Sequence, residues 1–296
     1  MQEPSQPSSI DELLTGRIAN AARPLSPAAL KVAHYLERNP GSAVTASAAE
    51  LARETGLSDA TVIRSVQALG FLGMEDLRRS LAAVLEGGSA GGRMRRTLHE
   101  TGEDPGVAID LALDAHQEAA TRLRSASMRE TLVAAVNLLG SAERIAVFGI
   151  GPSAMLARYT SMLLVRSGRQ AVCLDTTGIA LADQLLGLRS GDAVLLLAYG
   201  RAYQEVTATI GQAREKRLPM VLVTDSLEPR LARHADVIVP AQRGRAERVA
   251  LHGATLVVLE ALVLGLAAID RPQTLEALEQ LNTLREAVSG TRRFDL

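Results

Sequence analysis

The spacing of hydrophobic residues changes partway along the chain, and this change predicts two differently built parts. Between residues 10 and 86, apolar positions recur at helical spacing, without the alternation that marks half-buried strands. From Arg144 onward, short apolar runs rich in Val, Leu and Ile alternate with helical segments. Runs of that kind are typical of parallel strands that are buried on both faces of a sheet. The five expected strands are 144–148, 170–174, 193–198, 220–224 and 236–239.

These patterns predict the fold class: an all-α domain followed by an α/β doubly wound domain with a five-stranded parallel sheet. The stretch 87–92, GGSAGG, has the composition of a flexible linker. We therefore expect an N-terminal domain over 1–86, a flexible linker over 87–106, and a connecting helix with the α/β domain over 107–296. One long helical pattern, from Val107 to Leu139, leads toward the first strand.

Two short helices joined by a tight turn are predicted between residues 46 and 71. Ser47 and Glu50 have the spacing of a capping box, which marks a helix start. Gly56 can adopt the left-handed conformation that ends this helix, and Ser58 caps the next one. The second helix is expected to bury Val62, Val66 and Leu69. This is the geometry of a helix-turn-helix, whose second helix can enter the major groove of DNA.

The candidate DNA contacts lie at the start and on the outer face of that second helix: Ser58, Thr61, Arg64, Ser65 and Gln67. Arginine with guanine and glutamine with adenine are the usual direct pairings. The alternative is a helical hairpin that serves only packing. The charge favours this alternative slightly, because residues 1–86 contain ten acidic and eight basic residues. Arginines just after the glycine-rich stretch, such as Arg93, are candidates for the missing phosphate contacts.

The segment Leu25 to Leu85 resembles the N-terminal domain of the RpiR family of bacterial regulators. The matching residues are Leu25-Ser26, Thr55-Gly56-Leu57-Ser58, Ala60-Thr61-Val62, Arg64, Ala68-Leu69-Gly70-Phe71 and Asp76-Leu77-Arg78. Where the family often has an aromatic or apolar residue after the arginine, this chain has Ser65. The resemblance implies binding to double-stranded operator DNA.

The first expected strand runs into a glycine-rich turn that predicts an anion site. Gly149, Gly151 and Ser153 stand between this strand and a helix, whose N-terminus offers N–H groups to an anion. One interpretation is dinucleotide binding, because Gly149, Gly151 and Ala154 fit the spacing and Asp175 ends the second strand. The other is a SIS (sugar isomerase) domain, a phosphosugar-binding fold whose first strand also ends in a G-x-G-x-S pattern.

Other segments favour the SIS resemblance, namely Arg189-Ser190-Gly191-Asp192, Thr224-Asp225-Ser226, Ala235-Asp236-Val237 and His252-Gly253-Ala254. SIS domains that bind phosphosugars usually carry a Ser-x-Ser-Gly-x-Thr-like loop after the third strand. This chain departs from that pattern over residues 198–203, AYGRAY, where Ala198, Gly200 and Tyr203 replace the hydroxyl residues. Arg201 could restore anion binding. The candidate effector-binding residues are Gly149, Gly151, Ser153, Tyr199, Gly200 and Arg201.

Composition and charge narrow the function classes. The net charge of −1 means that DNA binding must come from local placement of charge, and the 2% of aromatic residues argues against a single-strand binder. Cys173 is the only cysteine and lies in an apolar run, which indicates a buried structural thiol. No metal site and no cofactor is expected. The N-terminus lacks a signal pattern, and the apolar stretch 249–269 contains His252 and Glu260, so a buried or interface helix and a cytoplasmic protein are expected.

The sequence therefore predicts a DNA-binding transcription regulator with no catalytic residues. We expect a dimer or tetramer whose C-terminal domain binds a small effector, with a phosphosugar as the candidate. One alternative is a phosphosugar isomerase with a helical N-terminal appendage, which needs a general base and an intact phosphate loop. A nucleotide-binding oxidoreductase is the second alternative.

Overall fold

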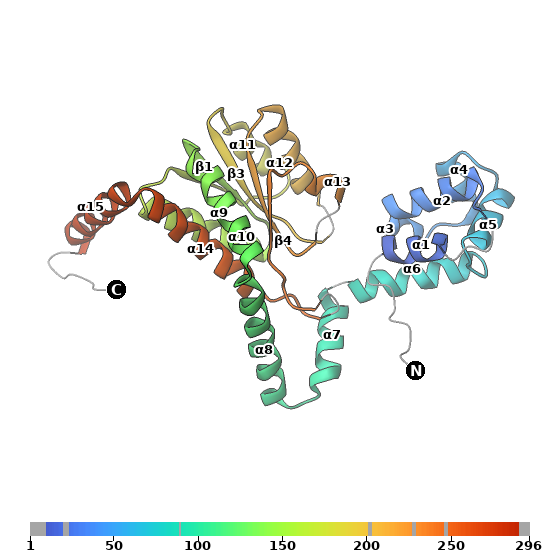
Figure 1. Ribbon diagram of the computed structural model, residues 1–296. Helices are drawn as coiled ribbons and strands as arrows, with labels where there is room; N and C mark the ends of the chain where they lie inside the picture. The colour runs from blue at the N-terminus through green and yellow to red at the C-terminus, as the bar shows by residue number, and fades with distance from the viewer. Residues whose placement is uncertain are drawn as a thin grey trace. The chain divides into compact units, whose positions relative to one another are not determined.

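The computed structural model describes residues 10–19, 24–88, 90–200, 203–226, 229–245 and 248–289 (Figure 1). The chain forms two units. The first consists of Met1–Asp110 together with Arg245–Ala250, and the second of Leu111–Gly244 together with Leu251–Leu296. We describe each unit by itself.

The regular structure of the first unit is helical over its described residues. Its helices are α1 (Ile10–Ala19), α2 (Pro27–Arg38), α3 (Pro40–Ala43), α4 (Ala48–Thr55), α5 (Asp59–Ala68), α6 (Met74–Gly88), α7 (Ala90–Thr101) and the first residues of α8 (Pro105–Leu123). One hydrophobic core joins α1 to α6 and includes Leu36, Leu51, Val66 and Leu77. Because α2 packs against both α4 and α5, the two helices of the predicted helix-turn-helix are held at a fixed angle.

The segment expected to be a flexible linker is helical instead. α6 continues to Gly88 and α7 begins at Ala90, while Ser89 lies outside the described residues. α7 is anchored by a segment from far along the chain. The Val249 amide donates a 3.0 Å hydrogen bond to the buried Thr97 hydroxyl, and Arg248 pairs with Glu100 at 2.5 Å. These tertiary contacts offset the cost of about 1 kcal/mol for each glycine in a helix, and sequence composition cannot reveal them.

The long helix expected between Val107 and Leu139 is broken into α8 and α9 (Ala126–Gly140). Ser125 stands at the break in an extended conformation, and its hydroxyl accepts a 3.3 Å hydrogen bond from the Met128 amide. A serine in this position is a strong N-cap, so it starts a new helix.

The second unit is built on a five-stranded, all-parallel sheet, as predicted. The strands are β1 (Arg144–Phe148), β2 (Ala171–Leu174), β3 (Asp192–Leu197), β4 (Met220–Thr224) and β5 (Val237–Pro240), in the order β2-β1-β3-β4-β5. Each differs from its predicted range by no more than one residue at either end. The strand order reverses between β1 and β3, and ligands bind beyond the carboxyl ends of the strands at such a switch point.

Helices cover both faces of the sheet, so the second unit has three layers (Figure 1). Alternate strand residues such as Val147 and Leu195 face α9, α10 (Pro152–Arg166) and α14 (Gly253–Ile269). Their neighbours Phe148 and Leu196 face the helices of the other side. These are α11 (Ile179–Leu186), α12 (Gln204–Glu215) and α13 (Pro229–Ala232). The last helix, α15 (Arg271–Ser289), follows α14 and has no buried residue.

A buried ion pair fastens the amino ends of the two central strands. Arg144 on β1 donates two hydrogen bonds to Asp192 on β3, at 2.9 and 2.7 Å, and the Asp192 side chain is fully buried. The Arg189 amide donates a third, at 2.8 Å. Burial alone would raise the pKa of Asp192, but the hydrogen bonds from Arg144 and Arg189 outweigh it and lower that pKa.

The apolar stretch near the C-terminus is a core helix, as predicted, since α14 buries one side against the sheet. Within the described residues, no single helix is long and apolar enough to cross a membrane. Only α14 and α15 taken together, bent by 107° at their junction, reach the required length and composition.

Candidate functional site

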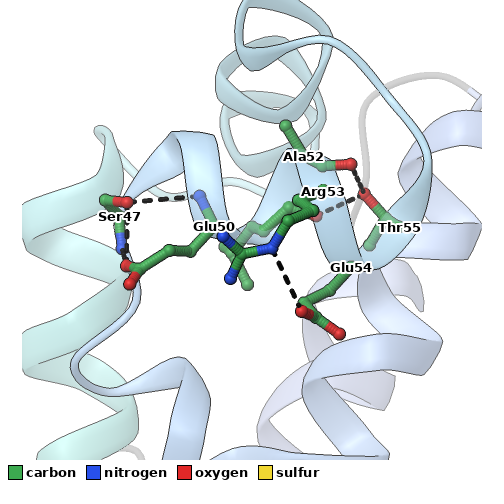
Figure 2. Close-up of polar contacts among 7 residues, drawn as sticks. Ser47, Glu50, Ala52, Arg53, Glu54 and Thr55 are labelled. Atoms are coloured by element: carbon green, nitrogen blue, oxygen red, sulfur yellow. Dashed lines mark hydrogen bonds and ion pairs between the residues drawn. The ribbon is translucent and has the colours of Figure 1, made fainter.

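The first helix of the predicted DNA-binding motif begins with the expected capping box (Figure 2). The Ser47 amide donates to the Glu50 carboxylate at 2.8 Å, and the Glu50 amide donates to the Ser47 hydroxyl at 3.2 Å. The hydrogen bonds from the Ser47 backbone and side chain lower the pKa of Glu50. This reciprocal pair fixes the start of α4.

The turn between the two helices is also as predicted. At the end of α4, the Thr55 hydroxyl donates a 2.6 Å hydrogen bond to the Leu51 carbonyl (Figure 2). Gly56 has φ 62° and ψ 36°, the left-handed conformation. Ser58 then caps α5, because its hydroxyl accepts from the Thr61 amide at 3.3 Å. The turn therefore delivers α5 with its N-terminal end exposed.

The structure places four of the five predicted DNA contacts at accessible positions and buries the fifth. Ser58, Arg64 and Gln67 are exposed, and Thr61 is half-buried. The prediction for Ser65 is wrong: only 3% of this residue is exposed, and it lies on the face of α5 that packs inward. The spacing of Val62, Ser65, Val66 and Leu69 is that of one helical stripe, and this signal could have placed Ser65 correctly.

Further side chains join this surface. Ile63 is exposed beside Arg64, although sequence reasoning did not single it out. Lys31 on α2 reaches the turn, because its Nζ would lie 3.6 Å from a Cβ added to Gly56. The outer face of α5 thus combines a cation, an amide and an apolar side chain, with a second cation beside its turn. Such a surface can contact phosphates and base edges.

The second predicted site lies at the carboxyl edge of the sheet and begins with the turn after β1. A Cβ on Gly149 would overlap the Ser153 carbonyl, and Gly151 has φ 58°, so both glycines are needed for the tight turn. The amides of Ser153 and Ala154 already donate to backbone carbonyls, at 3.2 and 3.0 Å. Fewer free N–H groups therefore face a ligand here than the glycine pattern suggests.

In the loop after β3, the Tyr199 side chain is directed toward α14. Tyr199 and Thr255 share a hydrogen bond of 2.8 Å between their hydroxyls, and the Tyr199 ring meets the His252 ring edge-on, with centroids 5.6 Å apart. Burial raises the pKa of Tyr199. Gly200 has φ 61° and donates its amide to the Ser226 carbonyl. The remaining predicted residue of this loop, Arg201, lies outside the described residues.

Sequence reasoning missed a cation at this edge that the described residues include. The Arg243 guanidinium lies over the Tyr199 ring, 4.0 Å from its centroid, and its Nε donates to an Asp225 carboxylate oxygen at 2.8 Å. Only 20% of the Arg243 side chain is exposed. The sequence pattern did not reveal these contacts, because the partners of Arg243 are 44 and 18 positions away in the chain. We call Tyr199, Asp225, Arg243 and His252 the edge cluster.

Two polar atoms at this edge are buried without a partner among the described residues, the Thr224 hydroxyl and Nδ1 of His252. Burial and the nearby Arg243 lower the pKa of His252, and Asp225 opposes them. The imidazole is therefore neutral at pH 7 and can both donate and accept a hydrogen bond. Unsatisfied groups of this kind are costly, so they mark positions that a ligand or water can fill.

Asp175, the acidic residue of the dinucleotide interpretation, already has hydrogen-bond partners within the protein. Asp175 accepts hydrogen bonds from Gln184, at 3.0 Å, and from Arg158. Burial tends to raise the pKa of Asp175, but these two partners lower it overall. The dinucleotide interpretation therefore lacks a free carboxylate. Next to it, Cys173 is half-buried rather than buried as expected, and burial raises the pKa of its thiol to about 11. The described residues contain no group of three metal-ligating side chains.

The fold and the two sites together define a class: a regulator that joins a helix-turn-helix to an α/β ligand-binding domain. Residues 13–87 match the model of the helix-turn-helix domain of the rpiR family, and residues 138–269 match the SIS domain model. The chain therefore combines a helix-turn-helix domain of the rpiR type with a SIS domain, which is the domain order of RpiR-type DNA-binding transcription regulators.

Two solved structures are similar to the chain. The chain is similar to the Vibrio vulnificus NanR protein complexed with ManNAc-6P, with 25% identity, a TM-score of 0.54, and coverage of 93% of this chain and 98% of that one. It is also similar to the sugar isomerase domain of an RpiR transcription factor from Sphaerobacter thermophilus, with 23% identity and a TM-score of 0.51. That match covers 59% of this chain and 96% of the other, and it shows the fold alone.

Proposed function

We propose that this protein regulates transcription in the cytoplasm as a homo-oligomer that binds operator DNA and responds to a small anionic effector. The observation that carries the proposal is the order of the two domains. An RpiR-type helix-turn-helix precedes a SIS domain, and this arrangement aligns with NanR along nearly all of both chains.

Operator recognition is proposed to come from the exposed side of α5, with Arg64 and Gln67 at base edges and Thr61 and Ser58 near phosphates. The test is fluorescence anisotropy of the full chain with duplexes from its own upstream region, against an unrelated competitor duplex. Arg64→Ala should weaken specific binding by about tenfold to a hundredfold, the usual value of one bidentate arginine–guanine contact. Arg79→Ala, an exposed arginine on α6, is the matched control. Equal binding of the two variants contradicts this assignment.

The effector is proposed to bind at the carboxyl edge of the sheet, over the switch point between β1 and β3. A sugar phosphate is the first candidate, because NanR was solved with ManNAc-6P. The loop after β3 lacks the hydroxyl residues of phosphosugar-binding SIS domains. In their place, the edge cluster supplies a guanidinium, a neutral imidazole and a tyrosine. We infer that Arg243 exchanges Asp225 for the anionic group of the effector.

Coupling between ligand and DNA is proposed to run through the segment Arg245–Ala250. This segment belongs to the first unit, while Arg243 and His252 on either side of it belong to the edge cluster of the second. Arg248 and Val249 hold α7 through the contacts described above. A ligand that repositions Arg243 or His252 would therefore also displace this segment. The ligand changes DNA affinity only if it has different affinities for the DNA-binding and the non-binding conformation of the protein.

Self-association is proposed to use the outer face of α14. Leu264 is 70% exposed, and an apolar groove of about 400 Å³ lies between α8, α9 and α14. A second copy that covers this surface would remove it from water and would pair two recognition helices on a palindromic operator. Sedimentation of Leu264→Lys should show a shift toward monomer. An unchanged oligomer contradicts this choice of surface.

We propose that the SIS domain binds its ligand without turning it over. The edge lacks the phosphate loop of the isomerases, and Tyr199 directs its hydroxyl to Thr255. Incubation of the purified protein with aldose and ketose phosphates should give no interconversion. Turnover abolished by His252→Ala would favour the isomerase alternative instead.

A further inference from the structure

The recognition helix α5 carries one large apolar side chain on its outer face. Ile63 is 39% exposed, whereas Val62 and Val66 on the same helix are fully buried. The other outward residues of this helix include Ala60, Arg64 and Gln67. Ile63 is not part of the hydrophobic core of its unit, so the exposed part of this branched aliphatic side chain can contact a molecule outside the unit.

The position of Ile63 on the helix narrows the kind of contact. It stands three residues after Ala60 and four before Gln67, so these three form one row along the helix. Arg64 lies beside this row, and its Nε donates to the Ala60 carbonyl at 3.2 Å, which directs that side chain toward the N-terminal end of the helix. The N-terminal half of a recognition helix approaches base edges most closely. Ile63 thus lies where base edges are read.

A major groove offers one apolar feature to such a side chain, the C5-methyl group of thymine, and the minor groove offers none. The polar neighbours Arg64 and Gln67 can read donors and acceptors, but neither detects a methyl group. We propose that Ile63 is a specificity-determining residue that reads the thymine methyl group within each operator half-site. The inference rests on the proposed operator binding.

The test uses the full chain and a specific duplex obtained from its upstream region, in which each thymine is replaced in turn by deoxyuridine. This exchange removes only the methyl group and keeps every hydrogen-bonding group. At one thymine per half-site, affinity should fall about fourfold, the ratio that corresponds to one buried methyl group. In Ile63→Ala the thymine-to-uracil ratio at that position should fall to about one.

Two variants separate base reading from a structural role. Arg64→Ala should weaken binding to both duplexes while it keeps the thymine-to-uracil ratio, and Ile63→Val should keep most of that ratio. Because Ile63 is exposed, Ile63→Ala should leave the thermal unfolding midpoint nearly unchanged.

The proposal is overturned if no deoxyuridine substitution affects wild-type binding, or if Ile63→Ala retains the thymine-to-uracil ratio. It is also overturned if Ile63→Ala changes only the sedimentation of the protein, which would assign Ile63 to a contact between copies. Absence of any specific duplex binding is a different result, because it removes the proposed operator binding itself.

Discussion

The recognition surface of α5 and the edge cluster of the sheet are both polar, but they are prepared differently. On α5, Arg64 and Gln67 project from a helix whose ends are fixed by local caps, and they face solvent. At the sheet edge, Arg243 is neutralised by Asp225 and stacked on Tyr199 before any ligand arrives. In the proposed function, the first surface needs no rearrangement to bind DNA, whereas Arg243 would exchange its internal partner Asp225 for the effector. Such an exchange of hydrogen-bond partners would couple ligand binding to a structural change in the protein.

The largest expected effect is a loss of stability of the sheet unit, caused by removal of a residue that fastens its strands and does not belong to the edge cluster. Arg144→Ala leaves the buried Asp192 charge without its main partner, and such losses cost about 3–5 kcal/mol. Hydrogen exchange should show lost protection in β1 and β3 and unchanged protection in α2, α4 and α5. Arg189→Ala is the control, because its side chain is largely exposed and 3.9 Å from Asp192. Equal destabilisation by both variants would mean that the pair does not fasten the strands.

A smaller effect is expected when the exchanging cation is removed. Arg243→Ala should weaken binding of an anionic effector by about tenfold to a hundredfold, the range for one charged hydrogen bond, and leave DNA affinity without effector unchanged. Titration calorimetry with ManNAc-6P and its dephosphorylated form gives the measurement. Arg243→Lys keeps the charge but loses the planar stacking on Tyr199, so its effector affinity should lie between those of the wild type and Arg243→Ala. Wild-type affinity in Arg243→Ala would remove Arg243 from the effector site.

The pH dependence of stability should test the contribution of the buried pair of Arg144 and Asp192. Asp192 has a lowered pKa in the folded state, so its contribution is complete above the unfolded value near 3.8 and is lost as the pH falls through the folded pKa. The sheet unit should therefore lose stability below about pH 4. Urea denaturation at pH 7, 5 and 3 measures this, and Asp192→Asn should flatten the profile over that range. The same slope in that variant would assign the acid sensitivity to other groups.

The smallest effect concerns the turn that sets the recognition helix. Gly56→Ala forces a side chain into the left-handed region and should cost roughly 1 kcal/mol in unfolding free energy. The new Cβ would meet only Lys31 Nζ at 3.6 Å, so the cost comes from the backbone. Gly41→Ala on α3 provides a control of opposite sign, because Gly41 has a helical backbone and free space around it. Its expected effect is a gain of about 0.5 kcal/mol. A loss of unfolding free energy in both variants would mean that the cost arises from side-chain packing rather than from backbone conformation.

The sequence predicted the elements that local interactions determine. The capping box of Ser47 and Glu50, the turn at Gly56 and the five apolar strands each depend on residues close together in the chain. Ser65 was misplaced because its polar side chain was assigned to the outer face, although the helical spacing places it on the buried face.

What could not be predicted depends on residues far apart in the sequence. The helical conformation of the glycine-rich segment depends on Arg248 and Val249, about 150 positions away from α7. The edge cluster likewise gathers Tyr199, Asp225 and Arg243 from the ends of three strands. The strand pattern predicted that these ends share one edge, but not which side chains neutralise one another there.

The central claim is that ligand binding at the sheet edge changes the affinity of α5 for DNA. The most direct test is anisotropy of the full chain on its specific duplex, with and without a panel of sugar phosphates that includes ManNAc-6P. We predict a change in DNA affinity of about fivefold to 150-fold for one ligand, absent in Arg243→Ala, together with an equal reciprocal change in ligand affinity when DNA is bound. The account would be contradicted by a ligand that binds the wild-type protein in calorimetry but leaves its DNA affinity unchanged.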